Sequence, residues 1–232
     1  MTSIADRLAN LSVAHLCDGC LRVATPMRVA PPLFPLLPGQ RLQGRVRPVR
    51  HYGSVDVFLE ALETSGPEDI LVVDNDGRDD EGCIGDLTVL EVQQAGLGGI
   101  VIWGRHRDSA ILRSIALPMF TRGACARGPV RLDPRGDDAF RIVRIGDQLA
   151  SAEDWVVADD DGVIFIADSI VGDVIAAAES IRDTEYRQTR AMASGASLRT
   201  QLRFADFLES RAADPSVDFR THLRGLNAAI EE

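Results

Sequence analysis

Two short apolar runs with a helix-like segment between them constrain the fold of this chain more than any other feature. The runs are "DILVVDN" (residues 69–75) and "GGIVIWG" (residues 98–104). Short continuous apolar runs of this kind are typical of strands that are buried on both faces. The intervening "IGDLTVLEVQQAG" predicts a helix that ends at Gly96. A strand–helix–strand unit of this kind predicts a parallel sheet with a right-handed crossover.

The segments on either side of this unit continue the alternation of helices and strands. Residues 4–17 predict an amphipathic helix that ends at the turn signal Asp18-Gly19. The proline-rich "PPLFPLLPGQ" (residues 31–40) predicts a loop or an extended connector. The other elements expected up to residue 123 are strands at 41–51 and 118–123 and helices at 54–65 and 107–116.

After residue 128 the pattern changes to short strands that would extend or flank the first sheet. These candidates, separated by Gly and Asp turns, are residues 130–133, 139–146, 154–160 and 162–168. A long helix at 168–190 and two amphipathic segments follow. We therefore predict an α/β class fold, with a single domain over residues 1–190 and a helical extension over residues 191–232.

The end of the helical extension has one apolar face. Phe219, Leu223, Leu226 and Ile230 recur at helical spacing. Such a face has to pack on something, and we expect it to contact either its own domain or a neighbouring subunit.

Composition excludes several classes of function. Lys and Arg total 25 against 35 Asp and Glu, and this net charge of -10, with no basic stripe, argues against a nucleic-acid partner. No apolar run approaches the roughly 20 residues of a membrane span, and the first residues lack the pattern of a secretory signal. We expect a cytoplasmic protein without a membrane partner.

The four cysteines are too few for a disulfide framework in a chain of 232 residues. Cys17 and Cys20 form a CxxC pair, which in principle suits redox chemistry or zinc. A redox pair needs a preceding strand, whereas the residues before this pair look helical. Buried or incidental thiols are the favoured interpretation.

Two charged signatures lie at the ends of the central apolar unit. Gly85-Asp86 opens the helix after the first buried strand, and Arg107-Asp108 follows the second strand. If those strands are parallel neighbours, the loops after them emerge at one edge of the sheet, which is where ligands bind in open α/β sheets. We therefore expect Asp86 to lie close to Arg107 and Asp108.

The residue types at this edge suit the binding of a small anion and a metal. The unpaired backbone amides of Leu87 and Thr88 would attract a carboxylate at the start of the helix. Arg107 offers a charged fork for the same group, Asp108 is an oxygen ligand for Mg²⁺ or Mn²⁺, and Asp86 would hold water or move a proton. The alternative is structural: Asp86 is a favourable first-turn acid, and the Arg107-Asp108 pair caps the next helix.

These residues resemble the signature of a known family. In the class II pyruvate aldolases related to 4-hydroxy-4-methyl-2-oxoglutarate aldolase, grouped with the regulator of ribonuclease E activity A, Gly-Asp or Gly-Glu precedes Arg-Asp by about twenty residues. Here the signature is Gly85-Asp86 and Arg107-Asp108, and the similarity extends over most of the chain. The resemblance implies a layered α/β/β fold of the swivelling-domain type.

The resemblance also implies an activity and a set of site residues. The expected reaction is metal-dependent cleavage of 4-hydroxy-2-oxo acids to pyruvate, a carbon–carbon lyase reaction with oxaloacetate decarboxylase as a side activity. Asp108 would hold Mg²⁺ or Mn²⁺, Arg107 and the main chain of residues 85–88 would bind the 2-oxo acid, and Asp86 would orient or deprotonate water. The resemblance further implies a homotrimer or hexamer, in which Glu185 of a neighbouring subunit is the candidate extra acid.

Two departures from the family pattern bear on the site. Leu87-Thr88 replaces the usual Leu-Leu or Leu-Ala, and "DNDGRDDEG" (residues 74–82) replaces a more glycine-rich, less acidic loop. The acidic loop could repel an anionic substrate, or its carboxylates could bind more metal. Neither departure removes a proposed ligand.

Other functions have less support in the sequence. The resemblance includes a regulator, so the alternative to catalysis is a non-enzymatic protein that binds a ribonuclease. Methyl transfer lacks a glycine-rich nucleotide fingerprint after the first strand. Catalysis through a Schiff base is excluded because the sequence contains no lysine.

The remaining candidate residues favour structural roles. "DDDG" at 159–162 lacks the spaced acids of a calcium loop and predicts a hairpin turn. His106 adjoins Arg107, but an ordinary turn residue is the favoured interpretation. Trp103 and Trp155 lie in expected strands and are most simply core residues.

Overall fold

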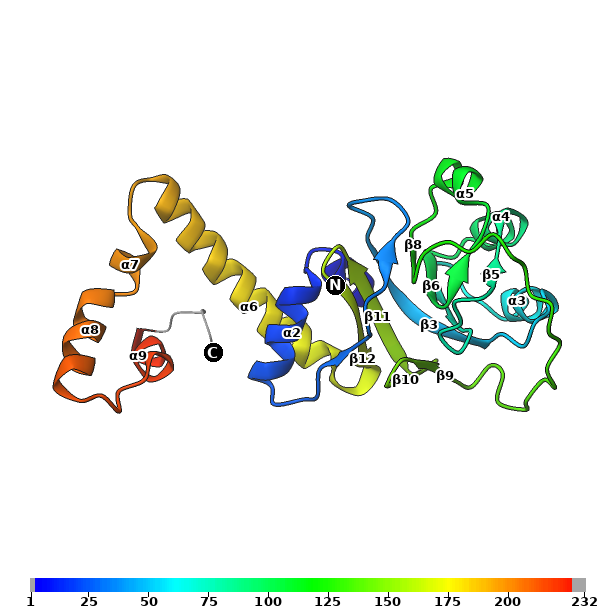
Figure 1. The fold of residues 1–232 in the computed structure, drawn as a ribbon. Coiled ribbons are helices and arrows are strands. Elements are labelled where there is room, and N and C mark those ends of the chain that lie inside the picture. Colours follow the sequence, from blue (N-terminus) through cyan, green and yellow to red (C-terminus); the bar gives the residue numbers. More distant parts are fainter. Residues whose placement is uncertain (1–2, 227–232) are drawn as a thin grey trace. The chain divides into compact units, whose positions relative to one another are not determined.

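The computed structural model describes residues 3–226 (Figure 1). The chain divides into two compact units. One comprises the residues up to Val13 together with Met27–Gly172, and the other comprises Ala14–Pro26 together with the residues from Asp173 onward. The first unit contains the sheets, and the second is helical.

An eight-stranded sheet of order β1-β12-β11-β3-β4-β6-β8-β2 is the framework of the first unit. Strands β3, β4, β6 and β8 are parallel neighbours, and the other pairings are antiparallel. The strands of this sheet are β1 (Arg28–Val29), β2 (Phe34–Pro35), β3 (Leu42–Arg50), β4 (Ile70–Asp74), β6 (Gly99–Trp103), β8 (Met119–Thr121), β11 (Asp154–Asp159) and β12 (Gly162–Ala167). The predicted parallel pair is confirmed as β4 and β6, with Ile70 opposite Gly99.

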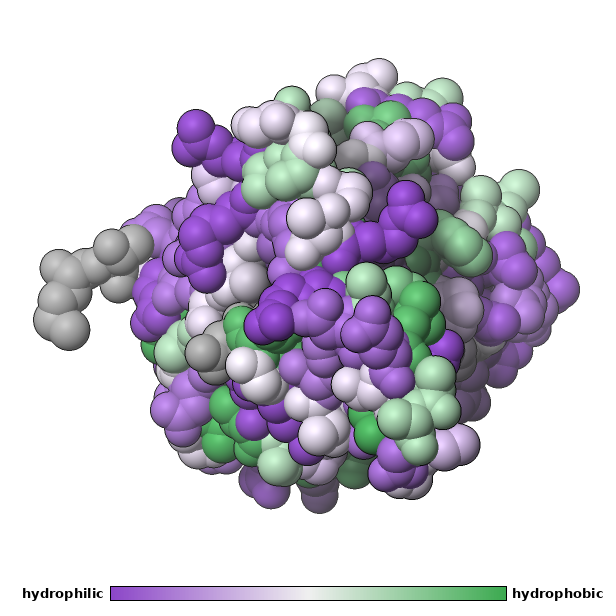
Figure 2. All heavy atoms as spheres, turned by 90° about the vertical axis from the view of Figure 1, so that its left-hand side faces the viewer, coloured by the Kyte–Doolittle hydropathy of each residue, from purple (hydrophilic) through white to green (hydrophobic). Residues whose placement is uncertain are grey.

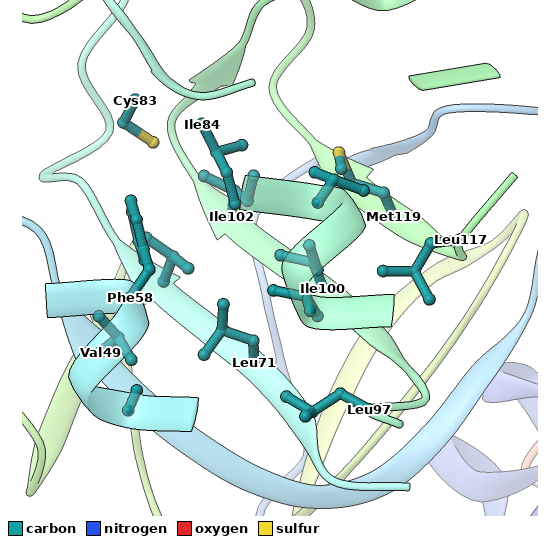
Figure 3. Close-up of a cluster of buried hydrophobic side chains, with 14 of the residues drawn as sticks. Val49, Phe58, Leu71, Cys83, Ile84, Leu97, Ile100, Ile102, Leu117 and Met119 are labelled. Atoms are coloured by element: carbon teal, nitrogen blue, oxygen red, sulfur yellow. The ribbon is translucent and has the colours of Figure 1, made fainter. Parts of the chain in front are cut away.

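The two apolar runs are buried on both faces because their side chains alternate between two cores. Leu71 and Val73 of β4 contribute to one cluster, which includes residues of α3 (Asp56–Leu62), α4 (Asp86–Gln94) and α5 (Ser109–Ile115) (Figure 3). Ile70 and Val72 contribute to the second cluster, which includes residues of β9 (Ile142–Ile145), β10 (Gln148–Ser151), β11 and β12. Continuous apolarity is therefore required of a strand in this position.

These contacts produce a layered mixed α/β fold. Helices α3, α4 and α5 cover one face of β4 and β6, and the β9–β10 hairpin packs against the other face (Figure 1). The predicted fold class is confirmed. The helix of the central unit ends as predicted, since Gly96 follows α4 with a φ of 83°, a left-handed conformation that favours glycine.

Several predicted elements are confirmed and one turn is placed correctly. "DDDG" forms the hairpin between β11 and β12, in which Asp159 pairs with Gly162. Trp103 and Trp155 lie in β6 and β11. The proline-rich connector contains the two-residue strand β2.

Three local predictions are wrong. The expected helix at 4–17 is two helices, α1 (Ile4–Leu8) and α2 (Val13–Arg22), and Asp18-Gly19 lies inside α2. Gly19 is small because α6 is close: a Cβ there would lie 2.8 Å from the carbonyl oxygen of Val174. Residues 130–133 form no strand, and the strand β10 was missed in the sequence.

The second unit contains the helices that follow the sheet. The long predicted helix is α6 (Asp168–Ala193), followed by α7 (Leu198–Gln201), α8 (Phe204–Ala213) and α9 (Phe219–Leu226). The apolar face of the last segment packs within this unit, where Leu223 is fully buried beside Leu202. Ile230 of the predicted apolar face lies outside the described residues.

The surface is polar over much of the face that Figure 2 presents, where hydrophilic residues surround smaller hydrophobic areas. Within residues 3–226, no helix combines the length and the apolarity that crossing a bilayer requires.

Candidate active site

A separate two-stranded parallel sheet brings the two charged signatures together. Its strands are β5 (Gly82–Ile84) and β7 (Arg105–His106), which directly precede Gly85-Asp86 and Arg107-Asp108. The backbone nitrogen of Arg107 donates to the carbonyl oxygen of Ile84 at 2.9 Å. The predicted convergence is confirmed, although its immediate cause is this small sheet.

Asp86, Arg107 and Asp108 meet around one carboxylate oxygen. Oδ2 of Asp108 lies 3.4 Å from the backbone nitrogen of Asp86 and 3.4 Å from Nε of Arg107. The 3.4 Å separations are long for hydrogen bonds, so the carboxylate is only weakly held by these two donors. It therefore retains oxygen lone pairs for another ligand.

Two glycines make room for this arrangement. A Cβ on Gly85 would lie 2.4 Å from Oδ2 of Asp108 and 3.0 Å from Nε of Arg107. A Cβ on Gly128 would lie 2.6 Å from Nη1 of Arg107. The guanidinium therefore lies between two backbone segments that carry no side chain at the point of closest approach.

The start of α4 has fewer free amides than the sequence indicated. Gly85 is the N-cap residue, and the amide of Val89 donates to its carbonyl at 3.1 Å. The amide of Leu87 donates to Oδ1 of Asp86 at 2.8 Å. Among the described residues the amide of Thr88 has no acceptor, so it is the donor most available to an anion at this helix end.

Asp108 has a backbone conformation that is uncommon outside glycine. It precedes α5 with φ 61° and ψ 33°, in the left-handed region that Asp tolerates better than most residues. Its side chain makes no capping hydrogen bond to α5. Asp108 is therefore the N-cap residue of α5 only through its backbone carbonyl, which accepts from Ile111 and Leu112. Its carboxylate is directed to Asp86 and Arg107.

The donor set at this site suits a hydrated hard cation. Within residues 3–226, no group of three or more His, Cys, Asp or Glu side chains is placed to hold a metal. Mg²⁺ and Mn²⁺ sites often use one or two carboxylates and water for the remaining positions. Asp108, with 35% of its side chain exposed and with Asp86 adjacent, fits that kind of site.

His106 is a structural residue of the strand β7 and not the turn residue that the sequence indicated. It is buried, and its Nδ1 and Nε2 atoms lie 2.9 Å from Oγ1 of Thr121 and 3.0 Å from Oγ of Ser109. Burial lowers the pKa of His106, and the positive charges of Arg113 and Arg105 lower it further. Its imidazole holds the start of α5 against β8.

Two of the four thiols, Cys20 and Cys83, are poor nucleophiles. Burial raises the pKa of Cys83, beside the site in β5, to about 12. Burial also raises the pKa of Cys20, the second cysteine of the CxxC pair, which lies with Cys17 inside α2. Because the thiolate is the reactive form, these positions do not suit redox or nucleophilic chemistry.

Glu185 lies on α6 in the helical unit. Its Oε2 is 3.0 Å from Nε2 of His15, and the pair joins α6 to α2 within that unit. This contact gives Glu185 a structural partner within its own chain.

A buried polar cluster at the ends of β3 and β4 was not predicted from the sequence. It consists of His51, Asn75, Glu81 and Arg131, and it lies beside a cavity of about 220 Å³. The acidic loop at 74–82, which departs from the family pattern, supplies Asn75 and Glu81. That loop was the available signal, but it did not indicate a buried histidine beside a partly buried arginine.

The comparisons with known proteins agree on one family. A family model described as RraA-like, Aldolase/RraA, matches residues 13–165. A protein of Alkalilimnicola ehrlichii, whose name provisionally assigns it as a 4-hydroxy-4-methyl-2-oxoglutarate aldolase, is 31% identical over 164 residues, which are 70% of this chain and 98% of that protein.

Solved structures with the same fold include two of bacterial origin. An uncharacterized protein from Pseudomonas syringae superposes with a TM-score of 0.75 at 22% identity, over 84% of this chain and 94% of that one. Streptomyces coelicolor RraAS2, described as an unusual member of the RNase ES inhibitor RraA family, superposes with a TM-score of 0.71 at 27% identity. That match covers 81% of this chain and 97% of the Streptomyces chain.

Proposed function

This chain belongs to the RraA-like (Aldolase/RraA) family, and on that premise we propose that it is a divalent-metal-dependent aldolase. Its substrates would be 4-hydroxy-2-oxo acids of the 4-hydroxy-4-methyl-2-oxoglutarate type, which it would cleave to pyruvate and a second carbonyl compound. Oxaloacetate decarboxylation would be a side activity because it passes through the same enolate of pyruvate. The observation that carries the proposal is the contact of Asp86 and Arg107 with one carboxylate oxygen of Asp108.

Arg107 is the group best suited to bind the 2-oxo acid. Its guanidinium is half-exposed, with 47% of the side chain accessible, and its single ion pair in the described part of the chain is the 3.4 Å contact with Asp108. A guanidinium binds a carboxylate with two parallel hydrogen bonds and stabilises negative charge that develops on a keto oxygen. Gly85 and Gly128 keep side chains away from that approach.

The start of α4 would bind the other side of the substrate. The free amide of Thr88 and the partial positive charge of the helix end favour a carboxylate there. The main chain from Gly85 to Thr88 would therefore act together with Arg107. The exposed side chain of Leu87, 78% accessible, lies at the edge of this anion-binding segment.

Asp86 is the candidate for proton transfer. Its Oδ1 accepts the amide hydrogen of Leu87, which holds the carboxylate in place and leaves Oδ2 free to accept a hydrogen bond from water. In retro-aldol cleavage the 4-hydroxyl group loses a proton and the methylene carbon of the pyruvate enolate gains one. A water oriented by Asp86 can carry these protons to and from the reacting atoms.

Asp108, with Asp86 nearby, would hold Mg²⁺ or Mn²⁺. Such a cation supplies Lewis-acid stabilisation of charge on the oxygens of a bound 2-oxo acid. The sequence contains no lysine, so a Schiff-base route is not open to this chain.

The direct test is an assay of pyruvate release from 4-hydroxy-4-methyl-2-oxoglutarate and from oxaloacetate, with Mg²⁺ and with EDTA. We expect metal-dependent turnover of both substrates. Arg107→Ala should lower kcat/KM by about 10- to 100-fold, the loss expected for a charge-assisted hydrogen bond worth roughly 1.5–3 kcal/mol. Full activity in EDTA, or unchanged turnover by Arg107→Ala, would contradict the proposal.

A regulatory function is the second candidate, and the similarity to RraAS2 is the observation that favours it. A regulator of this kind would bind a ribonuclease and would not need Arg107 for catalysis. Co-purification of the chain with a purified ribonuclease, together with an absence of pyruvate release, would favour regulation over the aldolase.

A further inference from the structure

A cavity of about 290 Å³ borders the proposed aldol site. Its lining residues include Arg78, Asp80, Glu81, Arg127, Gly128 and Arg131. Gly128 also belongs to the aldol site, because a Cβ there would lie 2.6 Å from Nη1 of Arg107. The guanidinium of Arg107 therefore lies against the backbone of the cavity wall.

The backbone of Arg127 is fixed beside the strand that leads into the aldol site. Its carbonyl oxygen accepts a hydrogen bond at 2.7 Å from the backbone nitrogen of Gly82, the first residue of β5. A Cβ on Gly82 would lie 2.5 Å from the carbonyl oxygen of Cys125, so this glycine lets the segment at 125–128 approach β5. Consecutive Cα atoms are about 3.8 Å apart, so Arg127 is placed directly beside the Gly128 backbone that Arg107 approaches.

Arg127 is the uncompensated cation of this cavity. Arg131 is paired with Glu81 at 3.0 Å, and Arg78 is paired with Asp80 at 2.7 Å. Within residues 3–226, the exposed side chain of Arg127 has neither an ion pair nor a hydrogen bond. Two lining carboxylates thus neutralise two of the three lining guanidinium groups, and one positive charge remains.

The carboxylate near Arg127 is already occupied by another arginine. Oδ1 and Oδ2 of Asp80 accept hydrogen bonds from Nε and Nη2 of Arg78, at 3.0 Å and 2.7 Å. The hydrogen bond with Arg78 is the main cause that lowers the pKa of Asp80, and the charge of Arg127 lowers it further. Arg127 therefore lies within electrostatic range of a lining residue but keeps its own donors free for a ligand.

We propose that Arg127 selects dicarboxylic substrates by binding the second carboxylate of a 2-oxo acid whose first carboxylate is bound at Arg107 and the start of α4. The inference rests on the proposed aldolase function and specifies its substrate class, which is 4-hydroxy-2-oxo acids with a carboxylate on C4. A guanidinium binds a carboxylate with two parallel hydrogen bonds. The carboxylate carbons of an extended five-carbon diacid are about 5 Å apart, a span that suits one guanidinium against Gly128 and another on the adjacent residue.

The binding test uses 2-oxoglutarate and 2-oxopentanoate, which share a five-carbon 2-oxo acid chain and differ in the second carboxylate. Neither has a 4-hydroxyl group, so neither undergoes retro-aldol cleavage, and affinity is measured without turnover. In titration calorimetry on the full chain with Mg²⁺, we expect 2-oxoglutarate to bind at least about 5-fold more tightly. Equal affinities, or no binding of 2-oxoglutarate, overturn the inference.

Substitutions at Arg127 locate the second carboxylate. Arg127→Gln should lower the affinity for 2-oxoglutarate to that for 2-oxopentanoate, and Arg127→Glu should reverse the order through charge repulsion. The matched control is Arg141→Gln, at another exposed arginine of the same unit with no ion pair within residues 3–226, and it should keep the preference. Arg107→Ala should weaken both compounds. A preference that survives Arg127→Gln, or unchanged affinities in Arg107→Ala, overturns the inference.

Turnover separates this inference from the aldolase proposal. Arg127→Gln should raise KM for 4-hydroxy-4-methyl-2-oxoglutarate and leave KM for 4-hydroxy-2-oxopentanoate, which lacks the second carboxylate, unchanged. Equal increases for the two substrates would overturn the inference. If the unsubstituted chain releases pyruvate from neither substrate, the aldolase proposal fails, whereas a preference for 2-oxoglutarate that depends on Arg127 still supports the dicarboxylate site.

Discussion

The backbone nitrogen of Asp86 lies 3.4 Å from Oδ2 of Asp108, although 22 residues separate them in the sequence. The contact depends on Gly85, since a Cβ at that position would lie 2.4 Å from the same carboxylate oxygen. The φ of Gly85 is -136°, which any residue adopts, so the requirement for glycine at this position is one of space. Substitution there tests the site without straining the backbone.

Gly85→Ala should reduce activity with little loss of stability. The added methyl displaces Asp108 and Arg107, which are both partly exposed and can move, so we expect kcat/KM for oxaloacetate to fall about 10-fold or more. The midpoint of thermal unfolding should change by only a few degrees. Gly172→Ala, at a helical glycine whose added Cβ meets open space, is the control and should keep full activity.

Asp108→Asn should remove metal activation while preserving the backbone. Asn also tolerates the left-handed conformation found here, with φ 61°, so the loop is expected to keep its shape. The loss of a carboxylate should weaken Mn²⁺ binding, measured by titration calorimetry, by at least about 10-fold, or roughly 1.4 kcal/mol. An unchanged Mn²⁺ affinity would show that the cation is bound elsewhere.

Gly19→Ala should destabilise the helical unit even though alanine favours helices. Alanine gains about 1 kcal/mol in helix propensity, but its Cβ would lie 2.8 Å from the backbone oxygen of Val174 and 3.2 Å from Cβ of Ala178. Overpacking against backbone costs roughly 1–3 kcal/mol, and the backbone oxygen cannot rotate away. Urea unfolding followed by circular dichroism should show a net loss, whereas Gly225→Ala in α9, where the added Cβ meets open space, should show none.

The predicted strands and the convergence of the site followed from patterns that are local in the sequence. The apolar runs of β4 and β6 can be buried in only one kind of position, between two cores, so their pairing was predictable. The meeting of Asp86 with Arg107 followed from that pairing. The strands β5 and β7, which complete the contact, have three and two residues, too few for a periodic pattern to appear.

The features that were missed depend on contacts between distant segments. Gly19 looked like a turn residue, but it lies inside α2, and its lack of a side chain is required by the approach of α6 near Val174, more than 150 residues later in the sequence. The group of His51, Asn75 and Arg131 combines three segments of the chain, and no spacing within any one of them indicates the group.

Exposed apolar residues of the first unit predict where subunits meet, if the proposed trimer or hexamer forms. Val130 and Leu132 are 76% and 73% exposed, and they lie in the segment that follows Gly128 and the guanidinium of Arg107. A double variant with Asp at both positions should lower the mass measured by light scattering to that of a smaller assembly. Leu149→Asp, at a 49% exposed position in β10, is the comparison and should not change the mass.

The stability of the sheet-containing unit should fall as the pH drops below about 6.5, the ordinary pKa of histidine. Burial is the main cause that lowers the pKa of both His51 and His106, so the unfolded chain binds more protons than the folded chain in this range. Their contribution is fully present above pH 6.5 and is lost as the pH falls toward the folded-state values, with a limiting slope of about 1.4 kcal/mol per pH unit for each group. His106→Gln, which can still bond to Thr121 and Ser109, should reduce that slope in urea titrations. Fluorescence of Trp103 and Trp155 reports on this unit alone, and an unchanged slope in His106→Gln would assign the pH dependence to other groups.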